Sequence, residues 1–432
     1  MKKSRFNLLV DINDRQALIF NSFSRGFLEL DRAHYDRFDK LDLSPEEELY
    51  KQLKRGFFIH DDDVDELRVY EARSLVSRYA SSSFGLTIVP TLDCNFACEY
   101  CFETHNKEYM SEETADQVVE FARGFLQGVR RFHLSWFGGE PLMARKIMDR
   151  VSRGLIQVCD EMGIAFSSDV VTNGYLLTEK NIEWLRELRV NQVQVTFDGD
   201  KETHDSRRRL KDGRPTFDVL IANLKKAAGK FKLNVRINID KNNVDKVRNI
   251  YPVIEESGLS NDVFVYFGTI FTATEACKDY EASCLDVDAL GKILLDYHGE
   301  ALEKNREYLT FPFPLAILGG CGAMKPTQFI IDAHGGLHKC LNTVGTDEDK
   351  LGHISQPVEM TPDLSWWLTW NPLNEPDCRE CRALPLCGGG CPYLRRKGDH
   401  TCTYFKTAEY MSKLLKLYYE GVYLKGRVGA RT

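Results

Sequence analysis

From residue 86 onward, short runs rich in β-branched residues alternate with amphipathic segments of helix length, and this alternation restricts the fold. We expect strands at 86–91, 132–139, 166–174, 192–199, 233–240 and 263–270. We expect helices near 112–127, 144–162, 178–189, 217–229, 243–257 and 286–304. Such alternation is typical of α/β folds with a parallel sheet and right-handed crossovers. Six units are too few for a closed eight-stranded barrel, so the chain is predicted to form an open, partial (β/α)6, TIM-like barrel, with function at the carboxyl ends of its strands.

The segments before and after this region have a different character. Residues 1–80 contain strands joined by turns and then helical patterns, which indicates a small winged-helix-like unit. Residues 305–320 are rich in Pro and Gly and are predicted to be a linker. Residues 321–405 show little periodicity and carry seven cysteines, so bound metal is expected to supply folding energy there. A helix is predicted near 405–424.

Composition and charge exclude several classes of partner. The chain of 432 residues has a net charge of −7, so it lacks the basic footprint that nucleic-acid binding requires. Arg207, Arg208, Arg209 and Lys211 form a local basic patch, which we interpret as a solvated loop. The N-terminus has no apolar segment of signal-peptide length, and no run reaches the about 20 apolar residues that span a bilayer. We expect a cytoplasmic protein with no membrane partner.

The thirteen cysteines need an explanation, because reducing cytosol disfavours structural disulfides and favours metal or redox roles for clustered thiols. Cys94, Cys98 and Cys101 lie just after the first predicted strand. A structural zinc site takes four protein ligands, whereas three thiolates suit a [4Fe–4S] cube that keeps one iron free for a small molecule. The missing fourth ligand is therefore interpreted as the functional feature. Cys159, Cys277 and Cys284 stand apart from both cysteine clusters.

This triplet, with Tyr100 before its last cysteine, closely resembles the signature of the radical S-adenosylmethionine (SAM) enzymes. The resemblance covers residues 84–304. It implies that the three cysteines hold a [4Fe–4S] cluster whose free iron binds SAM. It also implies reductive cleavage of SAM to methionine and a 5′-deoxyadenosyl radical that abstracts a substrate hydrogen, chemistry that belongs to the cofactor.

Further motifs agree with this resemblance. FGGEP (137–141) follows the second predicted strand, where the family's GGEP motif binds the amino group of the cofactor. TNG (172–174) and FDG (197–199) end the third and fourth predicted strands. The resemblance implies cofactor contacts for Tyr100, Gly138, Gly139, Glu140, Pro141, Asn173 and Arg208.

The C-terminal cysteines look like the SPASM extension of radical SAM enzymes, which would occupy residues 305–432 together with the linker and the last helix. By spacing alone, a four-thiolate zinc site is the alternative, from Cys378, Cys381, Cys387 and Cys391. The resemblance implies two auxiliary [4Fe–4S] clusters, and hence three clusters in all. Its outer set is Cys378, Cys381, Cys387 and Cys402, and its inner set is Cys321, Cys340 and Cys391.

One departure concerns the inner set. Relatives with an eighth cysteine have it where this chain has Thr327. The inner cluster then has three evident cysteine ligands, and either another residue, such as Cys277 or Cys284, completes it or its fourth iron is open to substrate. An open iron beside the radical site would favour thioether formation at a substrate cysteine.

SPASM enzymes mostly modify peptides or proteins, so the resemblance implies a maturase of a ribosomally made precursor peptide that forms a thioether or another side-chain crosslink. Residues 1–80 resemble the domain that binds the precursor's leader by β-augmentation. An external electron donor of the flavodoxin or ferredoxin type is also implied. The alternatives are a sulfatase-maturase-like enzyme that forms formylglycine, a small-molecule dehydrogenase, and a non-enzymatic iron–sulfur electron carrier. Leu341 follows Cys340 where sulfatase maturases typically have an Asp, and this counts against formylglycine formation. The sequence identifies no catalytic base.

Overall fold

One sheet of nine strands dominates the fold, and six of its members lie side by side in chain order. The structure, a computed structural model, describes residues 1–272, 274–309, 316–346, 349–402 and 408–423. Every neighbouring pair among the six strands is parallel, which confirms the expected α/β architecture. The six are β6 (Ser83–Ile88), β7 (Arg131–Trp136), β8 (Ala165–Thr172), β9 (Val190–Phe197), β10 (Lys232–Ile239) and β11 (Val263–Thr269).

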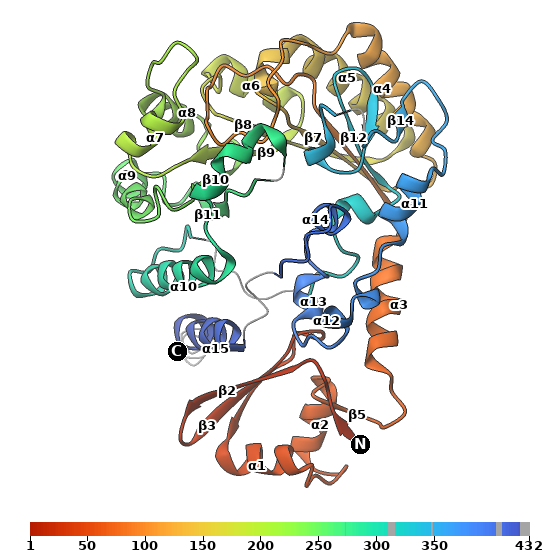
Figure 1. Cartoon of the computed structure of the whole chain (residues 1–432), viewed down its shortest axis with the longest axis vertical. Helices are drawn as coiled ribbons and strands as arrows, with labels where there is room; N and C mark the ends of the chain where they lie inside the picture. The colour runs from red at the N-terminus through yellow and green to blue at the C-terminus, as the bar shows by residue number, and fades with distance from the viewer. Residues whose placement is uncertain (273, 310–315, 347–348, 403–407, 424–432) are drawn as a thin grey trace.

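Helices follow each of these strands and lie along the outer side of the sheet (Figure 1). The side chains of Ser111 and Thr178 cap two of them by accepting hydrogen bonds from the backbone of the first turn. The helices are α4 (Glu112–Phe125), α5 (Arg145–Met162), α6 (Glu179–Glu187), α7 (Lys201–Arg207), α8 (Phe217–Ala227), α9 (Ile250–Glu256) and α10 (Val287–Glu303).

Two connections differ from the predicted elements. The helix expected at 243–257 is the short α9, preceded by the 3-10 turn η2 (Val247–Asn249). It starts late because the buried Asn243 amide donates to the backbone oxygens of Asp198 and Asn238, which holds the chain in a loop at that point. Helix α7 was not predicted, and the side chain of Asp200 caps its N-terminus.

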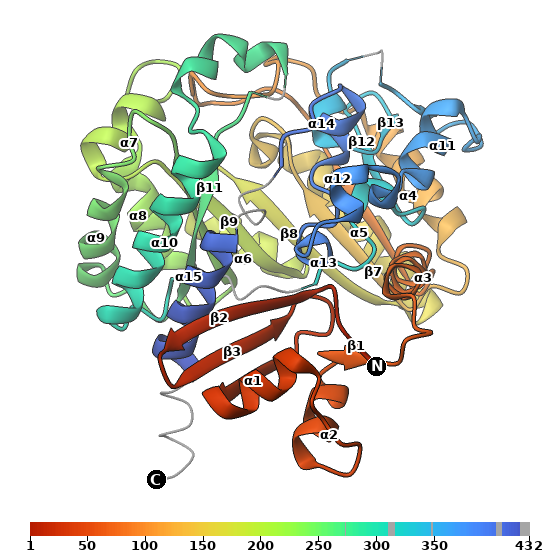
Figure 2. The ribbon, with the colours of Figure 1, turned by 60° about the horizontal axis from the view of Figure 1, so that its bottom comes forward.

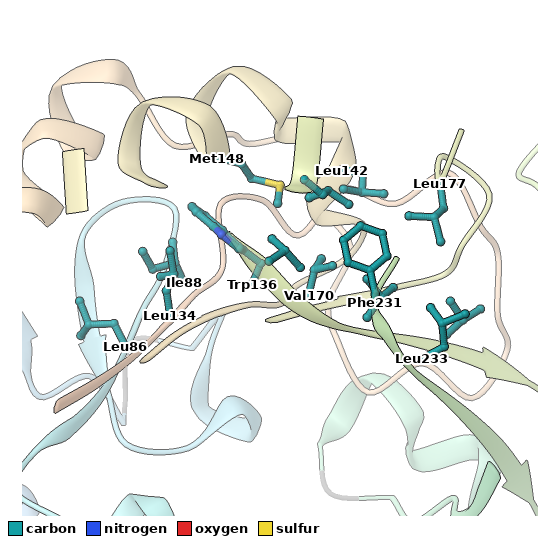
Figure 3. Close-up of a cluster of buried hydrophobic side chains, with 14 of the residues drawn as sticks. Leu86, Ile88, Leu134, Trp136, Leu142, Met148, Val170, Leu177, Phe231 and Leu233 are labelled. Carbon is teal, nitrogen blue, oxygen red and sulfur yellow. The ribbon is translucent and has the colours of Figure 1, made fainter. Parts of the chain in front are cut away.

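Side-chain alternation gives each strand two different faces. One face is apolar and packs under the helices: Figure 3 shows Leu134 and Trp136 of β7 beside Val170 of β8 and Met148 of α5. Trp136 and Met148 are fully buried there. The opposite face of the same strands carries polar side chains and points into the open side of the barrel.

The C-terminal segment extends this same sheet. Strand β12 (Gln328–Ile331) pairs in parallel with β6, and the antiparallel strands β13 (Gly336–His338) and β14 (Gly352–His353) follow. The helices beyond them are α11 (Pro362–Thr369), α12 (Pro376–Arg379), α13 (Leu384–Cys387), α14 (Pro392–Arg396) and α15 (Ala408–Tyr418), which continues as a π-turn over Tyr419–Tyr423. Within the predicted linker, residues 310–315 lie outside the described residues, as do 405–407 of the predicted last helix.

Residues 1–60 form a layer at one end of the molecule, and the helix that follows runs from it along the C-terminal segment, where Arg78 donates to the backbone oxygens of Leu368 and Trp370 (Figure 1 and Figure 2). A three-stranded antiparallel sheet, in the order β2-β3-β4, packs against α1 and α2 on one face and against α15 on the other. The elements are β1 (Lys2–Lys3), β2 (Asn7–Asn13), β3 (Gln16–Asn21), β4 (Phe27–Asp31), α1 (Arg32–Lys40), α2 (Glu48–Arg55), β5 (Ile59–His60) and α3 (Glu66–Arg78).

The described part of the chain contains no helix that is both long and apolar enough to cross a membrane.

Candidate active site

A cavity of about 660 Å³ lies on the open side of the barrel and joins the two cysteine-rich regions of the chain. Its wall includes Cys94, Cys98 and Cys101 from the loop after β6, and Cys321 and Cys340 from the C-terminal segment. Residues far apart in sequence therefore share one chamber. The parallel pairing of β12 with β6 brings the C-terminal segment to this position.

The three cysteines of the first cluster all line this cavity. Burial raises the pKa of the Cys94 and Cys101 thiols to about 12, and nearby thiols add to the effect on each. An uncharged thiol is thus favoured in the protein without metal, whereas a bound cation would stabilise the thiolates. The Thr274 hydroxyl donates a hydrogen bond to the Phe102 carbonyl at 2.5 Å and so holds the cysteine loop just after Cys101.

The FGGEP loop packs directly against the chain that leads into this triplet. Gly138, at φ +124°, has no room for a Cβ because the Thr91 carbonyl occupies the space. The Gly139 and Glu140 backbone amides donate to the carbonyls of Thr91 and Asp93, at 3.2 and 2.9 Å. Both glycines line the cavity. The glycines therefore fix the loop beside Cys94 and leave backbone exposed to the chamber.

Glu140 lies behind this loop rather than on the cavity wall. Its carboxylate accepts hydrogen bonds from the Thr172 hydroxyl at 2.8 Å and from the backbone amides of Leu142 and Asn173. Burial raises its pKa to about 7 although these donors favour the charged form. Glu140 thus ties the loop after β7 to the loop after β8; its contact with a cofactor stays a prediction, as does that of Pro141, which starts the 3-10 turn η1 (Pro141–Ala144).

Tyr100, Asn173 and Arg208 meet around the triplet and all line the cavity. The Asn173 amide lies 3.7 Å from the Cys94 sulfur and donates to Asn95. The Arg208 guanidinium donates to the Tyr100 hydroxyl at 2.7 Å and lies over the Phe96 ring. Its Nε is buried without a hydrogen-bond partner among the described residues. The structure thus gathers these three residues in one place, while their contacts with a cofactor stay a prediction.

The interpretation of the arginine run as a solvated loop was wrong for its first two members. Arg207 ends α7, and its guanidinium binds Asp198 at 2.7 Å and Asp240 at 2.5 Å, with both carboxylates fully buried. Arg208 is 8% exposed. Only Arg209 fits the predicted solvated position, with its side chain 48% exposed. Sequence reasoning missed α7, and therefore the turn that carries these side chains inward.

The C-terminal cysteines separate into two groups. Burial raises the pKa of Cys340 to about 12, with Cys391 and Cys321 as neighbouring thiols. Burial also raises the pKa of Cys378 to about 11, and its neighbouring thiols are Cys387, Cys402 and Cys381. The thiols that act on one another thus divide as the resemblance implies, while the ligands of each cluster stay a prediction, as does the alternative zinc site of Cys378, Cys381, Cys387 and Cys391. Among the described residues, no three His, Cys, Asp or Glu side chains are close enough to hold a single metal ion.

The position of the absent eighth cysteine does not face the chamber. Thr327 is half-buried and its carbonyl accepts from the Gly85 amide, at the start of the pairing between β12 and β6. Cys277 is buried in the 3-10 segment η3 (Glu275–Ser283). Burial raises the pKa of Tyr393, and the nearby thiols of Cys340, Cys391 and Cys277 raise it further. Leu341 lines the cavity. Cys277 is thus near the inner set, while its part in a cluster stays a prediction.

Sequence reasoning missed the polar inner wall of the barrel. His133, Gln194, Thr196, Arg236 and Asn238 all line the cavity from the inner faces of β7, β9 and β10. The signal was present in the strands themselves, since RFHLSW, VNQVQVTF and KLNVRINI alternate apolar and polar residues. The apolar residues face the helices, and the polar residues that alternate with them face the cavity.

Comparisons with known proteins agree with this geometry. Residues 88–251 match the model of the Radical SAM superfamily. A serine-type anaerobic sulfatase-maturating enzyme of Klebsiella pneumoniae is 22% identical over 329 residues, which cover 71% of this chain and 81% of that enzyme.

Two solved structures share the fold. Native anSMEcpe with bound AdoMet and Kp18Cys peptide superposes with a TM-score of 0.63 at 20% identity, covering 78% of this chain and 97% of the other. Streptococcus suis SuiB bound to precursor peptide SuiA superposes with a TM-score of 0.55 at 15% identity, covering 94% of this chain and 98% of the other. The two structures show the shared fold, while the family match over residues 88–251, with the cysteine triplet and the glycine loop, shows that the chain is an enzyme with a radical SAM domain.

Proposed function

We propose that this enzyme is a peptide maturase that uses radical chemistry to form a thioether or another side-chain crosslink in a ribosomally made precursor. The single observation that carries the proposal is the chamber of about 660 Å³ that reaches both the cysteine triplet and Cys321 with Cys340. A peptide side chain in this chamber lies between two sets of thiols. A small metabolite would need only the first set, the cysteine triplet.

The residues around the triplet fit a [4Fe–4S] cluster with bound SAM. The three thiols of the triplet line one wall, the His105 Nε2 lies 3.3 Å from the Cys101 sulfur, and the Nε of Arg208 is buried there without a hydrogen-bond partner among the described residues. When bound, the cofactor pair supplies the radical that removes a hydrogen atom from the substrate. The chain's own part is to hold and shield: Asn173 and Tyr100 line the wall, and Gly138 and Gly139 present backbone to the chamber.

The two C-terminal thiol groups support two auxiliary [4Fe–4S] clusters, an inner one at the chamber and an outer one away from it. Cys321 and Cys340 of the inner set line the chamber. Such clusters would pass electrons between the substrate and an external donor of the flavodoxin or ferredoxin type. Buried thiols with raised pKa values lose their protons on metal binding, which couples cluster insertion to folding of this segment.

The N-terminal layer is suited to binding the precursor's leader. Both faces of its sheet are covered, by α1 and α2 on one side and by α15 on the other, so a guest strand has only the edges. Strand β4 is one edge, paired with β3 alone among the described strands. The match to SuiB leaves only about 26 residues of this chain uncovered, so it includes most of residues 1–80. We propose that the leader adds a strand to β4.

This docking predicts local protection of β4 in the intact enzyme. The candidate leaders are the peptides encoded by short reading frames beside the gene. When the true precursor is added, amide hydrogen exchange in residues 27–31 should slow by about tenfold or more, because new backbone hydrogen bonds form along the edge. A precursor with proline at alternate leader positions should protect less. Tight binding with unchanged exchange in these residues would disprove the leader site.

A sulfatase-maturase-like activity is the second candidate, favoured by the match to the Klebsiella enzyme over most of both chains. Leu341 lines the chamber at the position where the resemblance expects an Asp, and Glu103 is the carboxylate on the wall among the described residues. The products separate the two candidates. Formylglycine carries an aldehyde that a hydrazide probe labels, whereas a crosslinked peptide stays unlabelled and resists cleavage between the joined residues.

A further inference from the structure

Two guanidinium groups on the chamber wall have no carboxylate partner. Arg208 and Arg236 both line the cavity, and within the described ranges neither forms an ion pair. Arg207, next in sequence to Arg208, has two buried carboxylates instead. Arg208 is buried and Arg236 is half-buried, and a guanidinium on a chamber wall without a carboxylate partner offers its free N–H groups to an anion.

Arg236 is held in a fixed position on the inner face of β10. Its Nε donates to the Asn238 side chain at 2.8 Å, and the Asn238 amide donates to the Tyr100 hydroxyl at 3.2 Å. The guanidinium is thus two hydrogen bonds away from the residue between Cys98 and Cys101. Gly268 of β11 makes this position possible, because a Cβ there would collide with the guanidinium. The glycine and the hydrogen bonds aim Arg236 into the chamber.

The two arginines need two carboxylates, and SAM has one. Arg208 contacts Tyr100 directly and lies over Phe96 within the triplet loop, so it is the arginine placed to serve the cofactor. Arg236 reaches Tyr100 only through Asn238 and stands between Thr196 and Tyr266 on the barrel wall. Its guanidinium is bound by the Asn238 side chain and the Thr269 carbonyl, and a carboxylate for its remaining N–H groups would come from the other occupant of the chamber. Planar guanidinium groups bind carboxylates with two parallel hydrogen bonds, which would fix that occupant's orientation.

We infer that Arg236 is a specificity-determining residue that binds a carboxylate of the substrate, an Asp or Glu side chain or a C-terminal carboxylate. The inference rests on the proposal that a peptide enters this chamber. It restricts the substrate to peptides whose reacting segment carries, or lies next to, an acidic group. The carboxylate would sit near the triplet, so the hydrogen that is removed would belong to the acidic residue or to its neighbour.

The test measures the binding of short peptides without turnover. Its outcome is therefore independent of whether the enzyme modifies a peptide. The probes are three blocked glycine pentapeptides: one with a central aspartate, one with a central asparagine, and pentaglycine with a free C-terminal carboxylate. Saturation-transfer NMR is recorded on the reconstituted, oxidised full-length enzyme with SAM. We expect the aspartate probe to bind about tenfold or more tightly than the asparagine probe, as charge-assisted hydrogen bonds imply. Stronger binding of pentaglycine acid than of the aspartate probe assigns the site to a C-terminus.

Variants decide whether Arg236 is the cause. R236Q should abolish the preference for the acidic probe, R236K should keep part of it, and K232Q, at the exposed first position of the same strand and off the cavity wall, should change nothing. G268A keeps every charge but displaces the Arg236 guanidinium, so it should also weaken the preference for the acidic probe. It replaces R236Q in the test if R236Q does not fold. Equilibrium dialysis of SAM is run on each variant. Equal binding of all three probes, no binding of any of them, a preference for a carboxylate that survives in R236Q, or loss of SAM binding in R236Q would each overturn the inference.

Discussion

Replacement of Cys94, Cys98 and Cys101 together with alanine is expected to abolish reductive cleavage of SAM. The three thiols lie at the chamber wall, and no fourth cysteine of the chain belongs to their group. Because the C-terminal thiols form separate groups, the variant should retain about eight irons per chain, the content of two cubane clusters. The measurements are 5′-deoxyadenosine by liquid chromatography and iron by colorimetry after anaerobic reconstitution.

Cys159→Ala is the matched control for this variant. Cys159 is fully buried on α5, and burial raises its pKa to about 11, but it lies in the helical layer behind the sheet. The control should keep both cleavage activity and full iron content. If the triple variant still produced 5′-deoxyadenosine, the assignment of the radical cluster to these cysteines would be wrong.

Arg207→Met is expected to be among the most destabilising single changes in the barrel. The variant leaves the buried carboxylates of Asp198 and Asp240 without their cation, a change that costs about 3–5 kcal/mol in buried ion pairs. It also removes the hydrogen bond from Arg207 to Tyr280 at 3.0 Å. A loss of that size should lower the midpoint of thermal unfolding by about 5 °C or more.

Arg209→Met is the control two residues along the same run. Its side chain is 48% exposed and its nearest carboxylate, Glu99, is 3.8 Å away. Surface changes of this kind alter stability by about 0.5 kcal/mol or less. Anaerobic differential scanning fluorimetry compares the two variants. Equal midpoints would show that the Arg207 network does not contribute to stability.

The strand–helix alternation was enough to predict the parallel barrel, because period-2 and period-3.6 patterns are local properties of the chain. It was not enough to predict that β12 joins the same sheet, since QFII is too short to distinguish from any apolar run. The 3-10 turn at η2 also escaped prediction. It depends on Asn243 binding carbonyls at Asp198 and Asn238, and such long-range hydrogen bonds leave no sequence pattern.

At the candidate site too, local sequence patterns predicted some features and tertiary structure decided the others. Spacing alone could not decide whether Cys391 joins Cys378 or Cys340. In the fold, burial and the nearby Cys391 thiol raise the pKa of Cys340, while the cluster that Cys391 would bind stays a prediction. Arg208 and Arg209 are neighbours with the same chemistry, yet one faces the chamber and the other faces solvent. The direction of each depends on the end of α7, which forms because Asp200 caps it. Side-chain direction at a helix end follows from tertiary structure and not from residue type.

The most direct test of the peptide-maturase account follows a hydrogen atom. Candidate precursors from the flanking reading frames are prepared in deuterated form and incubated with reconstituted enzyme, SAM and reductant. The account predicts that deuterium from the peptide appears in 5′-deoxyadenosine and that the same peptide becomes crosslinked, both detected by mass spectrometry. Formation of 5′-deoxyadenosine that contains no deuterium, beside peptides of unchanged mass, would contradict it.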